Sequence, residues 1–404
     1  MTRLAIAVGV GTFALFCLAL GSTFAADEVV HSPIRPDGVW RWIFVGAVVG
    51  AFVLFLLGLY VLRLQPAPLA AVLVIAAAIQ LAPLASPLLL STDAYGYWES
   101  GWIAAVADKS PYDHPPREFL GNPANPHRGA AWNDYPTWYG PVFVAATEAQ
   151  AELVDTRAGV VRFYKLLGAL AMLVVVALTA YCARRKAYAA AFVGWNPLLA
   201  LHFAGGGHND AWMIALFLGA LAAWRSGRRQ FAGVLWVLSI AIKWVPLMWV
   251  PLDVLANRTS RTRPPWLGLA VGFGLVSVVA TWLFGLSWID SFLPISDQIG
   301  LSSSTSIPFH VASLLDVPTL WVGRGFFLLF LAAYCALLVQ AWRGRSRRAL
   351  ATALLLCSVA WLGPWYILWC VPLAAIEEDG AAEALSLGLT GFLLRDVLPV
   401  PWIF

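Results

Sequence analysis

Long apolar runs recur along this chain of 404 residues, and they constrain its fold more than any other feature. Each run is near the length of a helix that crosses the roughly 30 Å hydrocarbon layer of a bilayer. Because that layer holds no water, a crossing backbone must satisfy its own hydrogen bonds, as a helix does. The sequence therefore predicts an all-α polytopic membrane protein with roughly 10 to 13 transmembrane helices. The clearest runs are 4–25, 42–62, 69–90, 160–182, 267–285 and 326–342.

Composition supports this prediction, since 60% of the residues are hydrophobic and only 12% are charged. A soluble fold could not cover so much apolar surface. The net charge of +4 is modest and lies in short basic loops, which argues against nucleic-acid binding. The first run resembles a secretory signal but is long for one, so we interpret it as a retained span. The five cysteines lack metal-ligand spacing and an evident disulfide partner.

Clusters of Lys and Arg set the expected orientation, because short basic loops stay in the cytoplasm. The clusters are 184–186, 225–229, 258–263 and 343–348. Placing all four inside makes the N-terminus cytoplasmic and exposes three outer loops of a cell-membrane protein, at about 91–159, 205–210 and 286–320. These loops should form one functional face. We treat residues 1–404 as a single multi-pass membrane domain, because the basic loops are helix ends rather than linkers.

Two stretches do not fit simple crossing helices. The segment 139–154 carries Glu148 and Glu152 and must begin and end outside, so we predict an amphipathic helix in the interface. The segment 231–255 would carry the next basic cluster outside if it crossed once. Its Lys243-Trp244-Val245-Pro246 break predicts two short helices that enter the membrane and return.

The first outer loop is the densest polar segment, and it begins directly after an apolar run. Aromatic side chains interleaved with carboxylates suit sugars, whose C–H faces stack on rings while hydroxyls need polar partners. An interfacial aromatic belt would also explain the rings, but it does not explain Asp93 at the membrane boundary. The candidates here are Asp93, Tyr95, Tyr97, Trp98, Asp113, His114, Asp134 and Tyr139.

The second polar feature is the turn Gly205-Gly206-Gly207-His208-Asn209-Asp210. Three glycines permit a close approach of backbone or ligand. Asp210 could simply cap the following helix, but capping requires neither His208 nor Asn209. We therefore predict that His208, Asn209 and Asp210 contact substrate. No metal-ligand spacing accompanies them, so we expect no metal site.

Charges at the ends of apolar segments need an explanation, because they are costly in a membrane. Lys243, Arg324 and Arg395 could bind a phosphate in the outer leaflet, or the two arginines could extend toward the interface from helix ends. His310 lies in the third outer loop and is a weaker candidate for substrate contact, since a lone histidine there is more often a solvated loop residue.

Taken together, these motifs resemble a known family of membrane enzymes. The elements occur in a fixed order across about 92–373: Asp93-x-Tyr-x-Tyr, Pro111-Tyr112 to Pro115, Tyr139-Gly-Pro, Asn196-Pro-Leu before Gly-Gly-His-Asn-Asp, Lys243 to Pro246, and Pro364-Trp365-Tyr366. The chain is similar to the GT-C membrane glycosyltransferases, specifically to the actinobacterial polyprenol-phosphate-mannose-dependent α-1,6-mannosyltransferases of lipomannan assembly. It departs from their pattern at Gly363, where they usually have His.

The resemblance implies a GT-C-like bundle whose large first outer loop bears interfacial helices. It implies inverting, metal-independent transfer of mannose from polyprenyl-phosphate-mannose to a glycan or glycolipid acceptor on the outer face, without a cofactor. Asp93 would be the general base, and Trp365 and Tyr366 would join the substrate-binding residues. The leaving phosphate needs only cations to stabilise its charge.

Other functions remain possible from the sequence. A transporter or a flippase for lipid-linked sugars would also have many spans and intramembrane charges, although it would more often show inverted repeats and a site at the midplane. A structural or receptor-like membrane protein leaves the boundary charges unexplained. Within the transferases, arabinofuranose or glucose could replace mannose, since only the resemblance favours mannose.

Overall fold

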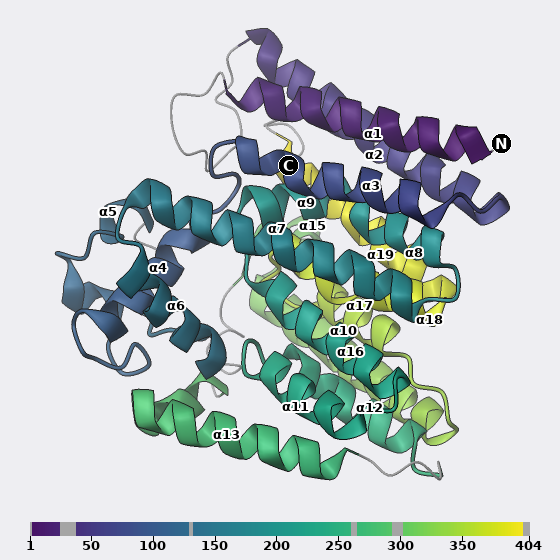
Figure 1. Cartoon of the computed structure of the whole chain (residues 1–404). Helices are drawn as coiled ribbons and strands as arrows, with labels where there is room; N and C mark the ends of the chain where they lie inside the picture. Colours follow the sequence, from purple (N-terminus) through teal and green to yellow (C-terminus); the bar gives the residue numbers. More distant parts are fainter. Residues whose placement is uncertain (1, 25–37, 129–131, 260–264, 293–301, 399–404) are drawn as a thin grey trace.

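The fold is a bundle of helices, with a smaller helical layer at one end (Figure 1). A computed structural model describes residues 2–24, 38–128, 132–259, 265–292 and 302–398. No β-strand occurs in these ranges, and five of their helices are long and apolar enough to cross a membrane. The prediction of an all-α polytopic membrane protein is confirmed. The five helices are α1 (Thr2–Thr23), α2 (Gly38–Leu64), α7 (Arg157–Cys182), α13 (Trp266–Phe284) and α16 (Thr319–Trp342).

Shorter helices fill the space between the long ones, and several join end to end. Asn196 shows how such a junction forms: its side chain accepts hydrogen bonds from the N–H groups of Leu198 and Leu199, while Pro197 starts the next helix. The shorter elements of the bundle are α3 (Leu69–Leu81), η1 (Ala82–Ala85), α8 (Lys186–Gly194), α9 (Pro197–Ala200), η4 (Leu201–Gly205), α10 (Asp210–Arg225), α15 (Ile307–Leu315), α19 (Gly380–Leu394) and η8 (Arg395–Val397).

Two pairs of short helices enter the bundle from one end and turn back inside it. In the first pair, α11 (Arg229–Ile240) is followed by a turn at Lys243, then by η5 (Val245–Met248) and α12 (Trp249–Ala256). This arrangement confirms the predicted break. In the second pair, α17 (Arg348–Ser358) leads to η7 (Pro364–Trp369) and α18 (Val371–Glu377). Both breaks carry proline, which cannot donate the next helical hydrogen bond.

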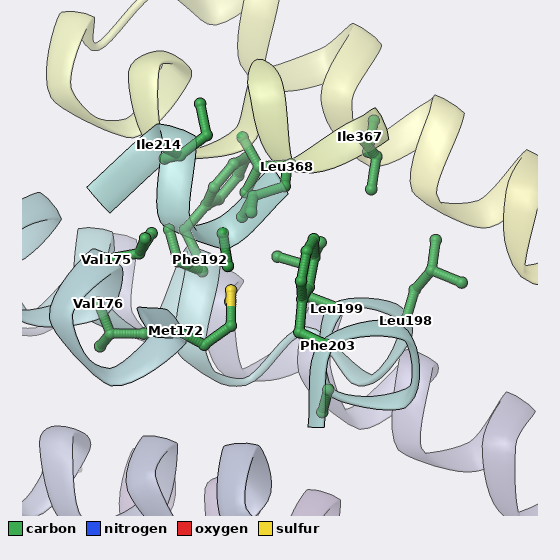
Figure 2. Close-up of a cluster of buried hydrophobic side chains, with 14 of the residues drawn as sticks. Met172, Val175, Val176, Phe192, Leu198, Leu199, Phe203, Ile214, Ile367 and Leu368 are labelled. Carbon is green, nitrogen blue, oxygen red and sulfur yellow. The ribbon is translucent and has the colours of Figure 1, made fainter. Parts of the chain in front are cut away.

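Apolar packing holds η7, the turn of the second pair, against the centre of the bundle (Figure 2). Side chains of α7, α8, α9, η4, α10 and η7 form one buried cluster: Met172, Val175, Val176, Phe192, Leu198, Leu199, Phe203, Ile214, Ile367 and Leu368. The cluster belongs to a larger core that extends from Ala5 to Val397. The cluster joins η4, which leads into the glycine-rich turn, to η7, which contains Trp365 and Tyr366. The assignment of the chain to one domain stays a prediction.

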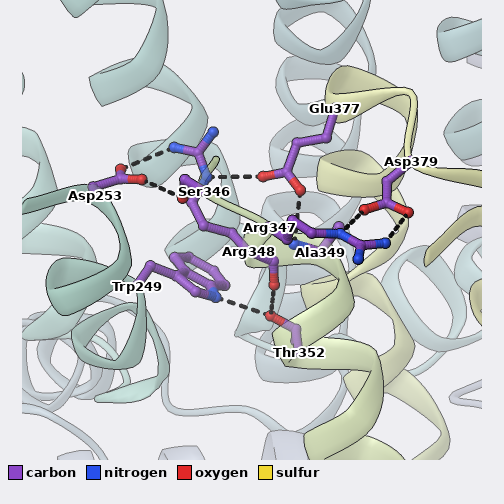
Figure 3. Close-up of polar contacts among 9 residues, drawn as sticks. All are labelled: Trp249, Asp253, Ser346, Arg347, Arg348, Ala349, Thr352, Glu377 and Asp379. Carbon is purple, nitrogen blue, oxygen red and sulfur yellow. Dashed lines mark hydrogen bonds and ion pairs between the residues drawn. The ribbon is translucent and has the colours of Figure 1, made fainter. Parts of the chain in front are cut away.

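Ion pairs gather where α12 and α18 end and α17 begins (Figure 3). The Arg348 guanidinium lies between Asp253 at 3.0 Å and Glu377 at 2.9 Å, so it joins α12, α17 and α18. The neighbouring Arg347 binds Asp379 through two nitrogens, at 2.5 and 2.7 Å. We call this region, with its loops at 183–185, 226–228 and 343–347, the basic end of the bundle.

The Arg348 network provides a first test of the fold. Replacing Arg348 with Met leaves two largely buried carboxylates without their partner, which should lower the free energy of unfolding by about 3–5 kcal/mol. Thermal unfolding of the detergent-solubilised protein measures the effect. The control is Arg343→Met, which changes an exposed arginine in the loop before α17. Equal melting temperatures for the two variants would contradict this account of the basic end.

Candidate active site

A small helical layer stands at the end of the bundle opposite α18 and the loop that follows α16 (Figure 1). We call the end that carries this layer the site end. The layer contains α4 (Asp93–Ala105), η2 (Pro116–Phe119), α5 (Asn125–Arg128) and α6 (Pro141–Leu153), with η6 (Ser287–Phe292) beside them. The predicted helix at 139–154 is therefore present. A cavity of about 340 Å³ lies between this layer and the bundle, along α4.

Asp93 lines this cavity as the first residue of α4. Its backbone N–H donates to the Ser91 hydroxyl at 3.1 Å, and its Oδ2 lies 3.2 Å from Nδ1 of His208. Burial alone would raise the pKa of Asp93, but His208, Ser91 and Lys243 together lower it below its ordinary value. An ionised carboxylate that faces a cavity can accept a proton, as a general base does.

The glycine-rich turn brings His208 to Asp93. The Leu89 N–H donates to the Gly205 carbonyl at 3.0 Å, so the segment just before Asp93 lies against the turn. Gly207 has φ +73°, and a Cβ there would lie 3.0 Å from Cβ of Tyr164, so a larger residue would be strained. His208 stacks on Trp365 with ring centroids 3.8 Å apart. Segments far apart in sequence therefore converge on Asp93.

Lys243 faces the same cavity from the first helix break. Its Nζ donates to Asp210 Oδ1 at 2.8 Å, and the Trp369 indole donates to the same oxygen at 2.6 Å. The ammonium also lies 4.5 Å from the ring centroid of Tyr366. The Asp210 carboxylate is fully buried, and it holds Lys243 rather than capping α10.

Tyrosines line the cavity between these two charged groups. Tyr97 and Tyr139 pack edge to face with centroids 5.2 Å apart, and the Tyr97 hydroxyl lies 3.5 Å from Asn209 Oδ1. Trp365 and Tyr366 line the wall contributed by η7. Of the turn residues, His208, Asn209 and Asp210 lie directly behind this lining and contact Asp93, Tyr97 and Lys243 respectively.

One charged pair in the cavity wall escaped the sequence analysis. Glu99 and Arg128 form a buried ion pair, and both line the cavity. Burial raises the pKa of Glu99 to about 7, although the Arg128 guanidinium opposes the shift. Glu99 lies in the same polar segment as Asp93, which was a usable signal. Arg128 belongs to no recognisable motif, and only the fold brings it to α4.

Several other predicted residues of the first loop lie outside the cavity lining. Tyr95 is buried and its hydroxyl accepts a hydrogen bond from Arg157 Nε at 3.1 Å, while Trp98 is buried among apolar side chains. Asp113 is exposed, and Asp134 forms an exposed pair with Arg117 at 3.1 Å. His114 does line the cavity and pairs with Glu118 at 2.7 Å.

Two of the three predicted phosphate-binding cations do not line the cavity either. Arg324 is exposed on α16, where its guanidinium lies over Trp321 at 5.3 Å. Arg395 lies in η8 and contacts His310 at 2.5 Å and Asp396 at 3.8 Å. Lys243 alone of the three faces the cavity. In the described residues no three His, Cys, Asp or Glu side chains gather as metal ligands, and metal independence stays a prediction.

Comparison with known proteins identifies the family of the chain. A family model described as "Alpha-(1->6)-mannopyranosyltransferase, N-terminal domain" matches residues 8–259, more than half of the chain. The chain belongs to this family. The predicted resemblance is thus confirmed, and the matched range contains Asp93, the glycine-rich turn and Lys243.

Two curated relatives are similar at modest identity. The probable alpha-(1->6)-mannopyranosyltransferase of Mycolicibacterium smegmatis is 27% identical over 230 residues, which are 50% of this chain and 38% of that protein. The alpha-(1->6)-mannopyranosyltransferase A of Mycobacterium tuberculosis is 27% identical over 367 residues, 76% of this chain and 67% of that protein. This chain therefore spans well under the full length of both. No solved structure matches it.

Proposed function

We propose that this protein is a membrane glycosyltransferase that moves mannose from polyprenyl-phosphate-mannose to a glycan or glycolipid acceptor. The observation that carries the proposal is the Asp93 carboxylate, which faces a cavity also lined by Lys243 and by aromatic rings. Such a cavity offers a base, a cation and stacking surfaces, the groups that sugar transfer from a lipid phosphate requires. Membership of the mannopyranosyltransferase family supports mannose as the sugar.

In the proposed reaction, Asp93 accepts the proton of an acceptor hydroxyl. The hydroxyl oxygen forms a bond to the anomeric carbon of mannose as the bond from that carbon to the phosphate oxygen breaks on the opposite face. The electron pair of the broken bond leaves with the polyprenyl phosphate, and the anomeric configuration inverts. The Lys243 ammonium stabilises the charge on the phosphate, and no cofactor takes part.

His208 and Asp210 position the two groups that act in the proposed reaction, the Asp93 carboxylate and the Lys243 ammonium. His208 is fixed by stacking on Trp365, so its contact with Asp93 Oδ2 restricts how that carboxylate rotates. Asp210 holds Lys243 at 2.8 Å and keeps the ammonium charged in a partly apolar wall. Both residues thus act through a neighbour rather than on the sugar.

We further propose that the cavity opens on the outer face of the cell membrane. Basic loops stay cytoplasmic in multi-pass proteins, and the basic end lies opposite the layer of α4, α5 and α6 (Figure 1), which contributes one wall of the cavity. A lipid-linked phosphosugar could then present its head group at the site end while its polyprenyl chain stays in the bilayer, among the membrane lipids.

Asp93→Asn is the sharpest test of the proposed base. The amide keeps the size of the side chain but cannot accept the proton, so turnover should fall by at least about two orders of magnitude. Donor affinity should persist, because the carboxylate acts on the acceptor hydroxyl. Initial rates with purified protein, polyprenyl-phosphate-mannose and a mannoside acceptor measure the change. Asp113→Asn, at an exposed site outside the cavity, is the control. Near-normal transfer by Asp93→Asn would show that Asp93 is not the general base.

Donor binding tests the role of Lys243. The double variant Lys243→Gln with Asp210→Asn exchanges the ion pair for two amides and leaves no buried charge alone. It should weaken donor affinity roughly tenfold or more, since a charge-assisted bond to phosphate contributes about 1.5–3 kcal/mol. Arg324→Gln should leave donor affinity unchanged, because Arg324 lies outside the cavity lining. Direct titration with the donor gives both values. A loss of affinity in Arg324→Gln alone would place the phosphate elsewhere.

Cysteine labelling tests the orientation. In a background without the five native cysteines, Asp113→Cys should react with an impermeant thiol reagent in intact cells. Arg184→Cys, exposed at the basic end, should react only after lysis. The reverse pattern would place the cavity in the cytoplasm.

A further inference from the structure

The cavity extends well beyond Asp93, along one side of α4. Thr92, Glu99 and Ile103 line it as one stripe, beside a second stripe of Asp93, Gly96 and Ser100. Six residues separate Asp93 from Glu99, a rise of about 9 Å along the helix axis. Glu99 is therefore too far along the helix to act on the bond that changes at Asp93, but it can contact another part of a bound substrate.

The Glu99–Arg128 pair is held rigidly but is not fully satisfied. The Arg128 side chain contacts Glu99 and Asn133, and its backbone carbonyl accepts a hydrogen bond from the Thr92 hydroxyl at 2.9 Å. Among the described residues Glu99 Oε1 has no hydrogen-bond partner, although Glu99 is only 1% exposed. A buried carboxylate oxygen without a donor is costly, so a ligand hydroxyl placed there would be favourable.

Aromatic rings line another part of the same cavity. Trp132 packs edge to face against Trp138 and against Trp361, with centroids 5.3 Å apart in both contacts. Trp361 comes from the break between α17 and η7, so the cluster joins the first loop to the bundle. All three rings line the cavity and remain partly exposed. Partly exposed rings beside a carboxylate and a guanidinium suit a sugar ring and its hydroxyls.

We propose that Glu99, Arg128 and the cluster of Trp132, Trp138 and Trp361 form a subsite for the acceptor sugar. The acceptor ring stacks on the tryptophans, and its hydroxyls bind Glu99 and Arg128, which presents the reacting hydroxyl to Asp93. This inference rests on the proposed transferase function. Two observations favour the acceptor over the donor. Glu99 is paired with the Arg128 guanidinium, so this part of the cavity presents little net positive charge to a lipid phosphate. The cation that acts on Asp93 is Lys243.

Two cavity variants test the subsite from different chain segments. Glu99→Gln and Trp361→Ala should each raise the acceptor KM and weaken acceptor binding by at least about tenfold. Donor affinity, and hydrolysis of the donor by water when no acceptor is present, should change less than about threefold. The acceptor is a short α-1,6-linked mannoside, and its binding is measured directly by saturation-transfer NMR. The matched controls are Glu152→Gln and Trp282→Ala, both exposed and outside the cavity lining.

The outcomes separate the subsite from the transferase function. Unchanged mannoside binding in both cavity variants would overturn the subsite, and so would an equal loss of donor affinity. A purified wild-type protein that binds the mannoside through these residues but transfers no sugar would overturn the transferase function and leave the subsite standing. Because Trp361 also packs against Trp132, thermal unfolding of each variant shows whether the fold is intact.

Discussion

The contact between Asp93 and His208 is the interaction on which the site depends. It joins the start of α4 to the glycine-rich turn before α10, and the stacking of His208 on Trp365 extends the connection to η7. A partly buried carboxylate is costly unless charges and hydrogen bonds stabilise its ionised form, which His208, Ser91 and Lys243 do here. The same contacts orient the oxygen that would accept a proton. The contacts that stabilise the negative charge of Asp93 therefore also hold its carboxylate in the position of a base.

Breaks in the helices form part of the cavity that Asp93 lines. The α11 helix ends at Ile240 and α17 ends at Ser358, so the chain turns inside the bundle and places Lys243 and Trp361 in the cavity wall. Backbone of this kind is tolerated at membrane depth only where protein or a cavity surrounds it. The ion pairs of Arg347 and Arg348 join the opposite end of α17 to α12, to α18 and to Asp379 at the start of α19. The bundle is thus fixed at its basic end and open at the site end.

Sequence reasoning reached the parts of the structure that depend on local pattern. Apolar length predicted the long helices, proline predicted the break after Lys243, and a carboxylate directly after an apolar run marked Asp93. Contacts between distant segments could not be predicted this way: Arg324 and Arg395 had the right charge, yet the fold places them outside the cavity lining. Arg128 reaches Glu99 only through the path of the first loop. A charged side chain in a membrane segment indicates that it needs an ion-pair partner, a ligand or the membrane interface. The sequence does not tell which of these it has.

The most direct measurement is the product that purified protein forms from polyprenyl-phosphate-mannose and a mannoside acceptor. If Asp93 activates the acceptor hydroxyl while phosphate leaves from the opposite face, NMR of the product should show mannose joined to the acceptor with an anomeric configuration inverted relative to the donor. Retention of that configuration would contradict a single displacement assisted by Asp93. The absence of any transferred sugar, from a folded protein that binds both substrates, would contradict the transferase function itself.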